Sequence, residues 1–207
     1  MYINDTEIEK GVSIPEGCPE RPTPPWTVPK GKVGTSFISK LLVNNFIELL
    51  KTRNRYLEVG SFDGIAISML AEQYPDKDFY AIDLLQNDGT GSAGCLPYII
   101  QNNKHLDNVH LYTDRSQEVM SNWLGNEKFK VDTAGMFDIV FIDGNHTYED
   151  SLVDMCLGWS LLNENGVMVV HDTNQTAIGV CYTAPLFCKL IGKEMIKFHG
   201  EGGFIFK

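Results

Sequence analysis

Residues 137–173 read FDIVFIDGNHTYEDSLVDMCLGWSLLNENGVMVVHDT, and this stretch contains two apolar runs that are each followed by an acidic residue. The runs FDIVFI and GVMVV lack the regular apolar and polar alternation of a half-exposed strand. Strands that are apolar on both faces are typical of the centre of a parallel sheet covered by helices. The helical pattern between the two runs supplies the crossover that parallel strands require.

The same alternation of strand and helix extends over most of the chain. The predicted strands lie at residues 56–59, 79–83, 109–112, 137–142 and 167–170. An amphipathic helix begins after Thr35 or Ser36 as N-cap, and further helices are predicted near residues 65–74, 95–105, 116–124, 148–162 and 178–191. This order predicts an α/β fold with a Rossmann-like, doubly wound sheet and right-handed crossovers.

The last segment, EMIKFHGEGGFIFK, has a different pattern. Two apolar runs are separated only by HGEGG, which leaves no room for a crossover helix. We therefore expect an antiparallel hairpin. Five parallel strands and this hairpin predict a seven-stranded sheet that is mostly parallel.

The first thirty residues hold six of the nine prolines, so helix and central strand are excluded there. We expect an extended arm over residues 1–32, followed by one domain over residues 33–207. Trp26 gives the arm an apolar side chain to bury, against the domain or against a second copy in a homodimer.

Composition restricts the partners. With 207 residues, 43% hydrophobic and 21% charged, the chain fits one globular domain, and it has no apolar run long enough to span a membrane. The net charge of −10 opposes binding to nucleic acid or to an anionic membrane. Because the opening residues are acidic where a secretory signal would be basic, we expect the protein in the cytoplasm.

A glycine motif follows the first predicted strand. Glu58-Val59-Gly60-Ser61-Phe62-Asp63-Gly64 has the spacing E-x-G-x-x-x-G and leads into a helix. It lacks the central glycine of G-x-G-x-x-G, the turn that seats a dinucleotide pyrophosphate. The motif favours a nucleoside ligand without phosphates, and an ordinary strand-to-helix turn is the alternative.

Polar residues after the next two strands fit the same ligand. Asp83 ends the second predicted strand, where a carboxylate can accept hydrogen bonds from both ribose hydroxyls. Ser116 and Gln117 follow the third strand and could bond the edge of a purine. A solvated acid and a simple helix cap are the alternatives.

The fourth and fifth strands end in acids. Asp143 and Asp172 should converge at one edge of the sheet, in an oxygen-rich setting that suits Mg²⁺ or another hard divalent ion. His146, three residues beyond Asp143, is placed to act as a general base. For His171 we expect a structural role at a strand end.

These residues resemble those of class I S-adenosylmethionine-dependent methyltransferases. LEVGSFDG resembles the first motif of that class and AIDLL the second. Residues 137–173 resemble the stretch shared by metal-dependent small-molecule O-methyltransferases, in particular the catechol-type enzymes and the sugar and macrolide enzymes of bacterial natural-product pathways. The resemblance covers roughly residues 35 to 207. It implies transfer of a methyl group from S-adenosylmethionine to a hydroxyl of a small molecule or sugar, assisted by a divalent metal and a histidine base.

The resemblance also implies a role for each matching residue. The cofactor would be bound by Glu58, Gly60, Ser61, Phe62 and Gly64 at its methionine part, by Asp83 at its ribose, by Ser116 and Gln117 at its adenine, and by Asp143. Asp143 and Asp172 would hold the metal, and His146 falls where these enzymes place the base. Thr173 stands at a position where catechol-type enzymes have an asparagine ligand, and Asn174 and Asn145 are alternatives for that position.

Two other functions stay open from the sequence. An NAD(P)-linked oxidoreductase has the same fold class, although the pyrophosphate turn is missing. A non-catalytic module that keeps a methyltransferase scaffold and recognises a glycan or a partner is also compatible with the fold.

Overall fold

The computed structural model describes residues 30–32, 38–85, 95–125, 135–174, 177–198 and 200–207. The strands are β1 (Arg55–Val59), β2 (Asp78–Ile82), β3 (Val109–Tyr112), β4 (Phe137–Ile142), β5 (Leu162–His171), β6 (Ile196–Phe198) and β7 (Gly202–Phe206). The helices are α2 (Lys40–Leu50), α3 (Ile65–Gln73), α4 (Leu96–Asn103), α5 (Ser116–Gly125), α6 (Tyr148–Leu161) and α7 (Ile178–Ile191).

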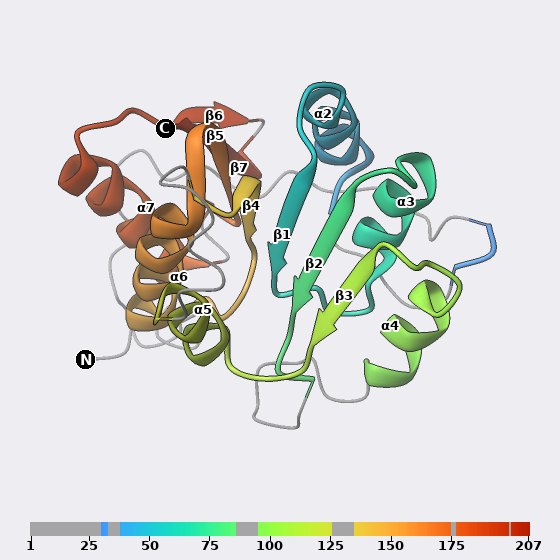
Figure 1. The fold of residues 1–207 in the computed structure, drawn as a ribbon. Helices are drawn as coiled ribbons and strands as arrows, with labels where there is room; N and C mark the ends of the chain where they lie inside the picture. Colours follow the sequence, from blue (N-terminus) through green and yellow to red (C-terminus); the bar gives the residue numbers. More distant parts are fainter. Residues whose placement is uncertain (1–29, 33–37, 86–94, 126–134, 175–176, 199) are drawn as a thin grey trace.

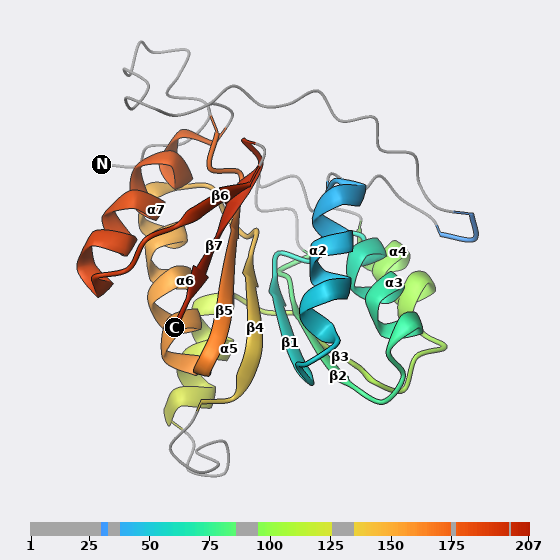
Figure 2. The same ribbon diagram turned by 90° about the horizontal axis from the view of Figure 1, so that it is seen from above.

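The strands form one seven-stranded sheet in the order β3-β2-β1-β4-β5-β7-β6. The first five strands are parallel, and β7 pairs antiparallel with both β5 and β6. Helices α2, α3 and α4 cover one face of the sheet and α5, α6 and α7 cover the other (Figures 1 and 2). The doubly wound α/β fold with a terminal hairpin is confirmed.

Strand β4 shows why the sheet needs both helix layers. Ile139 and Phe141 pack in the apolar core on the side of α2 and α3, whereas Val140 and Ile142 pack in the core on the side of α5 to α7. All four side chains are at most 4% exposed. Because successive side chains of a strand point to opposite faces, an apolar run here is stabilised only between two covering layers.

The hairpin depends on glycines in β7. A Cβ atom on Gly202 would lie 2.3 Å from the carbonyl oxygen of Val170 in β5. The glycines of GEGG therefore allow β7 to pair closely with β5, in addition to forming the turn.

Some predicted boundaries were wrong. Strand β5 begins at Leu162 rather than near residue 167, and its pairing with β4 shifts register between Phe137 and Ile139. The polar residues of this first half lie at an exposed end of the strand, so apolar periodicity did not reveal it. Helix α2 begins after Ser39, whose hydroxyl accepts a hydrogen bond from Leu42 N at 3.1 Å, so the predicted N-cap was wrong.

Several predictions concern residues outside the described part of the chain. Residues 1–29, Thr35 and Ser36 lie outside the described residues, so the arm and the domain boundary at residue 33 stay predictions. No helix among the described residues has the length and apolar character needed to cross a membrane.

The turn after β1 is held by a close backbone contact at Gly60. This residue has φ +86°, and a Cβ atom on it would lie 2.0 Å from the carbonyl oxygen of Asp143. The amide of Gly60 donates to Ile82 O, and the amide of Asp143 donates to Val59 O, each at 2.8 Å. Only glycine combines this positive φ with so close an approach between the ends of β1 and β4.

We expect Gly60→Ala to lower the free energy of unfolding by about 3 kcal/mol or more, because it adds a backbone clash to the strain of a positive φ. Gly192→Ala is the matched control, since Gly192 has φ +66° and nothing within 4 Å of an added Cβ. The control should cost only about 1 kcal/mol. Urea denaturation measures both values, and equal losses would contradict the contact as described.

Candidate active site

The carboxyl ends of three central strands meet at one edge of the sheet. Val59 pairs with Ile142, and Ile142 pairs with Val170, so the residues that follow β1, β4 and β5 start at the same level. Strand β1 has β2 on one side and β4 on the other, and the strand order reverses between β1 and β4. In open α/β sheets, ligands bind at this switch point.

Glu58 is buried beside this edge. Its side chain is 1% exposed and accepts a hydrogen bond from the Tyr56 hydroxyl at 2.8 Å. Burial raises the pKa of Glu58 to about 8, the Tyr56 hydroxyl opposes the rise, and the nearby Asp143 carboxylate adds to it. Without a cationic partner, this acid is therefore largely protonated near neutral pH.

Asp83 ties the glycine motif to the end of β2. One carboxylate oxygen accepts from Phe62 N at 2.7 Å, and the other accepts from Leu85 N at 2.9 Å. A carboxylate has about four lone-pair positions, so these two bonds alone do not prevent Asp83 from accepting hydrogen bonds from a ligand's hydroxyls. The acid predicted to bind a ribose also positions the loop that would bind the rest of the same ligand.

The backbone is strained where these loops turn. Among the described residues, four non-glycine residues have positive φ: Phe62, Leu85, Asn165 and Asp172. Three of them follow β1, β2 and β5 at the edge that carries the predicted site. Such strain gathers at functional sites because the surrounding structure must hold it.

Ser116 and Gln117 begin α5 and both contact an acid that was not predicted. The Ser116 hydroxyl donates to Oδ1 of Asp154 at 2.7 Å, and the Gln117 amide Nε2 donates to the same oxygen at 2.9 Å. Asp154 lies on α6 and is 1% exposed. Its burial raises its pKa to about 7, and the two hydrogen bonds oppose the rise.

Asp143, His146 and Asp172 come together as the sequence predicted. One possible ligand atom from each lies within 4.8 Å of the others. His146 Nε2 is 3.2 Å from Asp172 Oδ2. Two carboxylates and an imidazole at this spacing can share one divalent cation, so the residues fit a metal. Thr173, the third predicted ligand, is buried directly after Asp172.

His171, predicted as a structural histidine at a strand end, is the last residue of β5 and contacts this cluster. It is 2% exposed, and its Nδ1 lies 3.0 Å from Asp143 Oδ1 and 3.3 Å from Asp172 Oδ2. Burial alone would lower its pKa, but the two carboxylates raise it well above its ordinary value. The two acids on either side of His171 therefore favour its protonated form.

The other face of His171 leads to helix α2. Its Nε2 is 3.4 Å from Glu201 Oε1 in the hairpin. Glu201 in turn accepts hydrogen bonds from the amide of Ser39 at 2.9 Å and from its hydroxyl at 2.6 Å. The N-cap of α2 is thus linked to the acidic cluster through one glutamate and one histidine.

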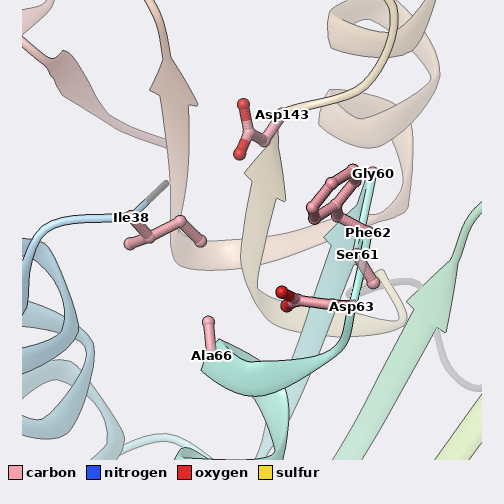
Figure 3. A pocket seen from close by; sticks show the side chains of 7 residues that line it. All are labelled: Ile38, Gly60, Ser61, Phe62, Asp63, Ala66 and Asp143. Carbon is pink, nitrogen blue, oxygen red and sulfur yellow. The ribbon is translucent and has the colours of Figure 1, made fainter. Parts of the chain in front are cut away.

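A pocket opens between the glycine motif and Asp143 (Figure 3). Asp143 enters it from the end of β4, Asp63 and Ala66 from the start of α3, and Ile38 from the opposite side. It is lined by Ile38, Gly60, Ser61, Phe62, Asp63, Ala66 and Asp143. A ligand in this pocket would contact the motif and the acidic cluster together.

The sequence matches a family model described as a methyltransferase domain over residues 57–173, which is more than half of the chain. The chain belongs to this methyltransferase family. The matched region begins at β1 and ends at Thr173, so it includes the glycine motif, Asp83, Asp154 and the Asp143–His146–Asp172 cluster. A search of curated protein sequences finds no match.

Solved structures of methyltransferases share the fold. The TDP-rhamnose 3′-O-methyltransferase of calicheamicin biosynthesis, CalS11, is 13% identical with a TM-score of 0.60, covering 80% of this chain and 77% of that chain. An O-methyltransferase from Bacillus cereus in complex with SAH is 14% identical with a TM-score of 0.58, covering 86% and 83%. TomG from Streptomyces achromogenes, an O-methyltransferase of tomaymycin synthesis in complex with SAM, is 16% identical with a TM-score of 0.53, covering 82% and 79%. The architecture is that of class I methyltransferases.

Two buried acids that contact residues of the candidate site were not predicted from the sequence. Asp154 is an acid on the buried side of a helix whose first turn is also acidic, and only its position facing α5 distinguishes it. Glu201 lies in the HGEGG turn, where an acid usually signals solvent exposure, yet it is 9% exposed. The sequence offered one signal for each: Asp154 stands in an otherwise apolar segment, and Glu201 stands in a glycine-rich one.

We expect Glu58→Gln to stabilise the ligand-free methyltransferase at pH 8 but not at pH 5. The unfolded chain releases this proton near 4.5 and the folded chain near 8, so the folded state binds more protons between these values. The stability of the natural protein therefore falls as pH rises through this window, by an amount on the order of 2 to 4 kcal/mol.

Urea denaturation of both proteins from pH 5 to pH 8.5 measures this difference. Glu194→Gln, at an exposed position, is the matched control and should follow the natural protein at every pH. A Glu58→Gln curve parallel to that of the natural protein would show that Glu58 ionises normally in the fold.

Proposed function

We propose that this methyltransferase transfers a methyl group from S-adenosylmethionine to a hydroxyl of a small molecule or sugar. The observation that carries the proposal is that the Asp143–His146–Asp172 cluster lies at the same sheet edge as the Glu58 and Asp83 carboxylates, with the Gly60 contact joining them. One ligand can therefore reach both groups.

The electrostatics of the edge favour a cationic cofactor. Glu58, Asp63, Asp83 and Asp143 are carboxylates with little or no exposure to solvent. S-adenosylmethionine brings a sulfonium and an ammonium group, and supplies the electrophilic methyl group. Binding of such a cation would favour the ionised form of Glu58, whose pKa is raised by burial.

The site residues divide between the two ends of the cofactor. Glu58, Gly60, Ser61, Phe62 and Gly64 would contact its methionine part, where the glycines let the backbone approach closely. Asp83 would accept hydrogen bonds from the ribose, and Ser116 and Gln117 would bond the adenine. The protein's main contribution is to align donor and acceptor, which can lower the barrier by about 7 to 11 kcal/mol.

Asp143 and Asp172, with Thr173 beside them, would hold Mg²⁺ or another hard divalent ion. When bound, such an ion lowers the pKa of a coordinated hydroxyl. His146 would remove the proton of the acceptor hydroxyl. Its Nε2 lies 3.2 Å from Asp172 Oδ2, next to the carboxylates that would hold the ion.

The acceptor class is supported by one solved structure in particular. CalS11 is a TDP-rhamnose methyltransferase that shares this fold, which favours a sugar hydroxyl among the small-molecule acceptors to be tested. We also expect a cytoplasmic enzyme without nucleic acid or membrane partners, whose proline-rich arm packs either on its own domain or across a homodimer.

We expect Asp83→Ala to weaken the binding of S-adenosylhomocysteine at least tenfold in calorimetry. The substitution removes the ribose acceptor and frees Phe62 N and Leu85 N, and hydrogen bonds to charged groups contribute about 1.5 to 3 kcal/mol each. Asp76→Ala, an exposed aspartate near the opposite end of β2, should bind like the natural protein. Absence of heat with the natural protein, or preference for NAD⁺, would refute the proposed cofactor.

We expect His146→Ala to lower turnover by about a hundredfold or more, because a positioned general base contributes about 10² to 10⁴ to the rate. Turnover is followed as S-adenosylhomocysteine formed with Mg²⁺ and a panel of sugar and phenol acceptors. Cofactor affinity should stay within about twofold, and His105→Ala, at an exposed histidine, should be fully active. Undiminished turnover in His146→Ala would show that His146 is not the base. If the natural protein formed no S-adenosylhomocysteine with any acceptor, a non-catalytic module would be favoured.

A further inference from the structure

Glu201 is a buried acid to which the proposed chemistry gives no task. It is 9% exposed, although it lies in the glycine-rich turn between β6 and β7. The register of the hairpin explains its place. His171, the last residue of β5, pairs antiparallel with Gly202, the first residue of β7. Glu201 therefore precedes β7 at the same edge of the sheet where Asp172 follows β5.

Two donors of Ser39 hold the Glu201 carboxylate from one side. Its Oε1 accepts a hydrogen bond from Ser39 N at 2.9 Å, and its Oε2 accepts one from the Ser39 hydroxyl at 2.6 Å. The hydroxyl oxygen of Ser39 also accepts from Leu42 N, as the N-cap of α2. The carboxylate is thus attached to a helix that packs in the core, where Leu42, Phe46 and Leu50 are at most 2% exposed.

The other side of the Glu201 carboxylate faces the imidazole of His171. Oε1 lies 3.4 Å from His171 Nε2. The opposite ring nitrogen, Nδ1, lies 3.0 Å from Asp143 Oδ1 and 3.3 Å from Asp172 Oδ2. The ring is 2% exposed, and its centroid lies 5.8 Å from that of the Phe141 ring. A rotation of the imidazole would move Nε2 away from Glu201 and Nδ1 away from the two aspartates at once.

Asp143 and Asp172 are the carboxylates proposed to hold a divalent ion. Side chains that ligate a metal are oriented by hydrogen bonds from groups behind them, and loss of such a group typically lowers metal affinity by about 10- to 100-fold. His171 stands in this position, because one of its nitrogens lies close to an oxygen of each carboxylate. Glu201 in turn stands behind His171.

We propose that Glu201 is a positioning residue of the candidate metal site. Anchored on Ser39, it holds the His171 imidazole in contact with both proposed metal-binding carboxylates, and so sets the arrangement in which they bind a divalent ion. This role rests on the metal part of the proposed function and does not involve the cofactor. It depends on where Glu201 holds the ring and not on the charge of Glu201, so an uncharged acceptor at the same point should serve.

The test measures binding of Mn²⁺, a divalent ion that carboxylates bind well, to the full chain without cofactor, with free Mn²⁺ followed by electron paramagnetic resonance. Glu201→Ala should weaken Mn²⁺ binding at least about tenfold, because the imidazole loses the contact behind it. Glu201→Gln should stay within about twofold of the natural protein, because its amide oxygen can replace Oε1. In both variants the affinity for S-adenosylhomocysteine should change less than about twofold in calorimetry, since Asp83 makes its hydrogen bonds without Glu201.

Glu194→Ala is the matched control. It removes an exposed acid just before β6 and should leave both affinities unchanged. If Glu201→Ala does not fold, Glu201→Asp replaces it. The shorter side chain keeps the charge but cannot reach Ser39 and His171 together, so the same loss of Mn²⁺ affinity is expected.

Mn²⁺ affinity in Glu201→Ala, or in Glu201→Asp, equal to that of the natural protein would overturn the role of Glu201 and leave the metal site intact. An equal loss in Glu201→Gln would show that the charge of Glu201 matters, and a parallel loss of S-adenosylhomocysteine affinity would show a general structural role; either result contradicts positioning.

The natural protein separates this role from the proposed function. If it binds S-adenosylhomocysteine but no Mn²⁺, the positioning role and the proposed metal are both overturned while the proposed cofactor stands. If it binds neither, the proposed function is overturned as well.

Discussion

The close approach of Gly60 to the backbone of Asp143 is the constraint on which the site depends. It joins the turn after β1 to the end of β4 with no space for a side chain between them. The glycine motif and the acidic cluster belong to different halves of the sheet, and this contact is what makes them one site. The parallel register of β2, β1 and β4 brings Asp83 to the same edge. Its carboxylate accepts a hydrogen bond there from Phe62 N in the glycine motif.

The ionisable side chains around this contact are mostly acidic. The protein is acidic overall, and several of its acids face the switch point of the sheet with little access to water. His171 lies between Asp143 and Asp172, and its contact with Asp172 lowers the pKa of that carboxyl well below its ordinary value despite burial. Among the described residues, no cation lowers the pKa of Glu58, and its raised value is consistent with a site that gains a positive charge when its ligand binds. The same network reaches Ser39, the N-cap of α2, through Glu201, so the chain next to the pocket residue Ile38 is linked to the acidic cluster.

The fold and the convergence of Asp143 and Asp172 at one sheet edge could be predicted from the sequence because both leave local marks. Apolar runs without alternation identified the central strands, and acids directly after β2, β4 and β5 identified the edge where they meet. The burial and the contacts of Asp154, Glu201 and His171 could not be predicted, because they depend on which residues face these side chains across the fold. Ser39 was not predicted as the N-cap for a related reason. Thr35, Ser36 and Ser39 all precede the helix, and the contact of Ser39 with Glu201 is a tertiary one that the local sequence does not reveal. Burial and pairing between distant segments are what sequence periodicity does not encode.

The account's central claim is that one adenosyl ligand spans the crevice from Glu58 and Asp83 to Asp143 and the start of α5. A crystal structure of the protein with S-adenosylhomocysteine and Mg²⁺ tests it most directly. The account predicts the ribose hydroxyls on Asp83, the amino acid part against Gly60 and Glu58, and the purine beside Gln117. A well-ordered ligand bound elsewhere on the protein, or a crevice that stays closed at saturating ligand, would contradict it.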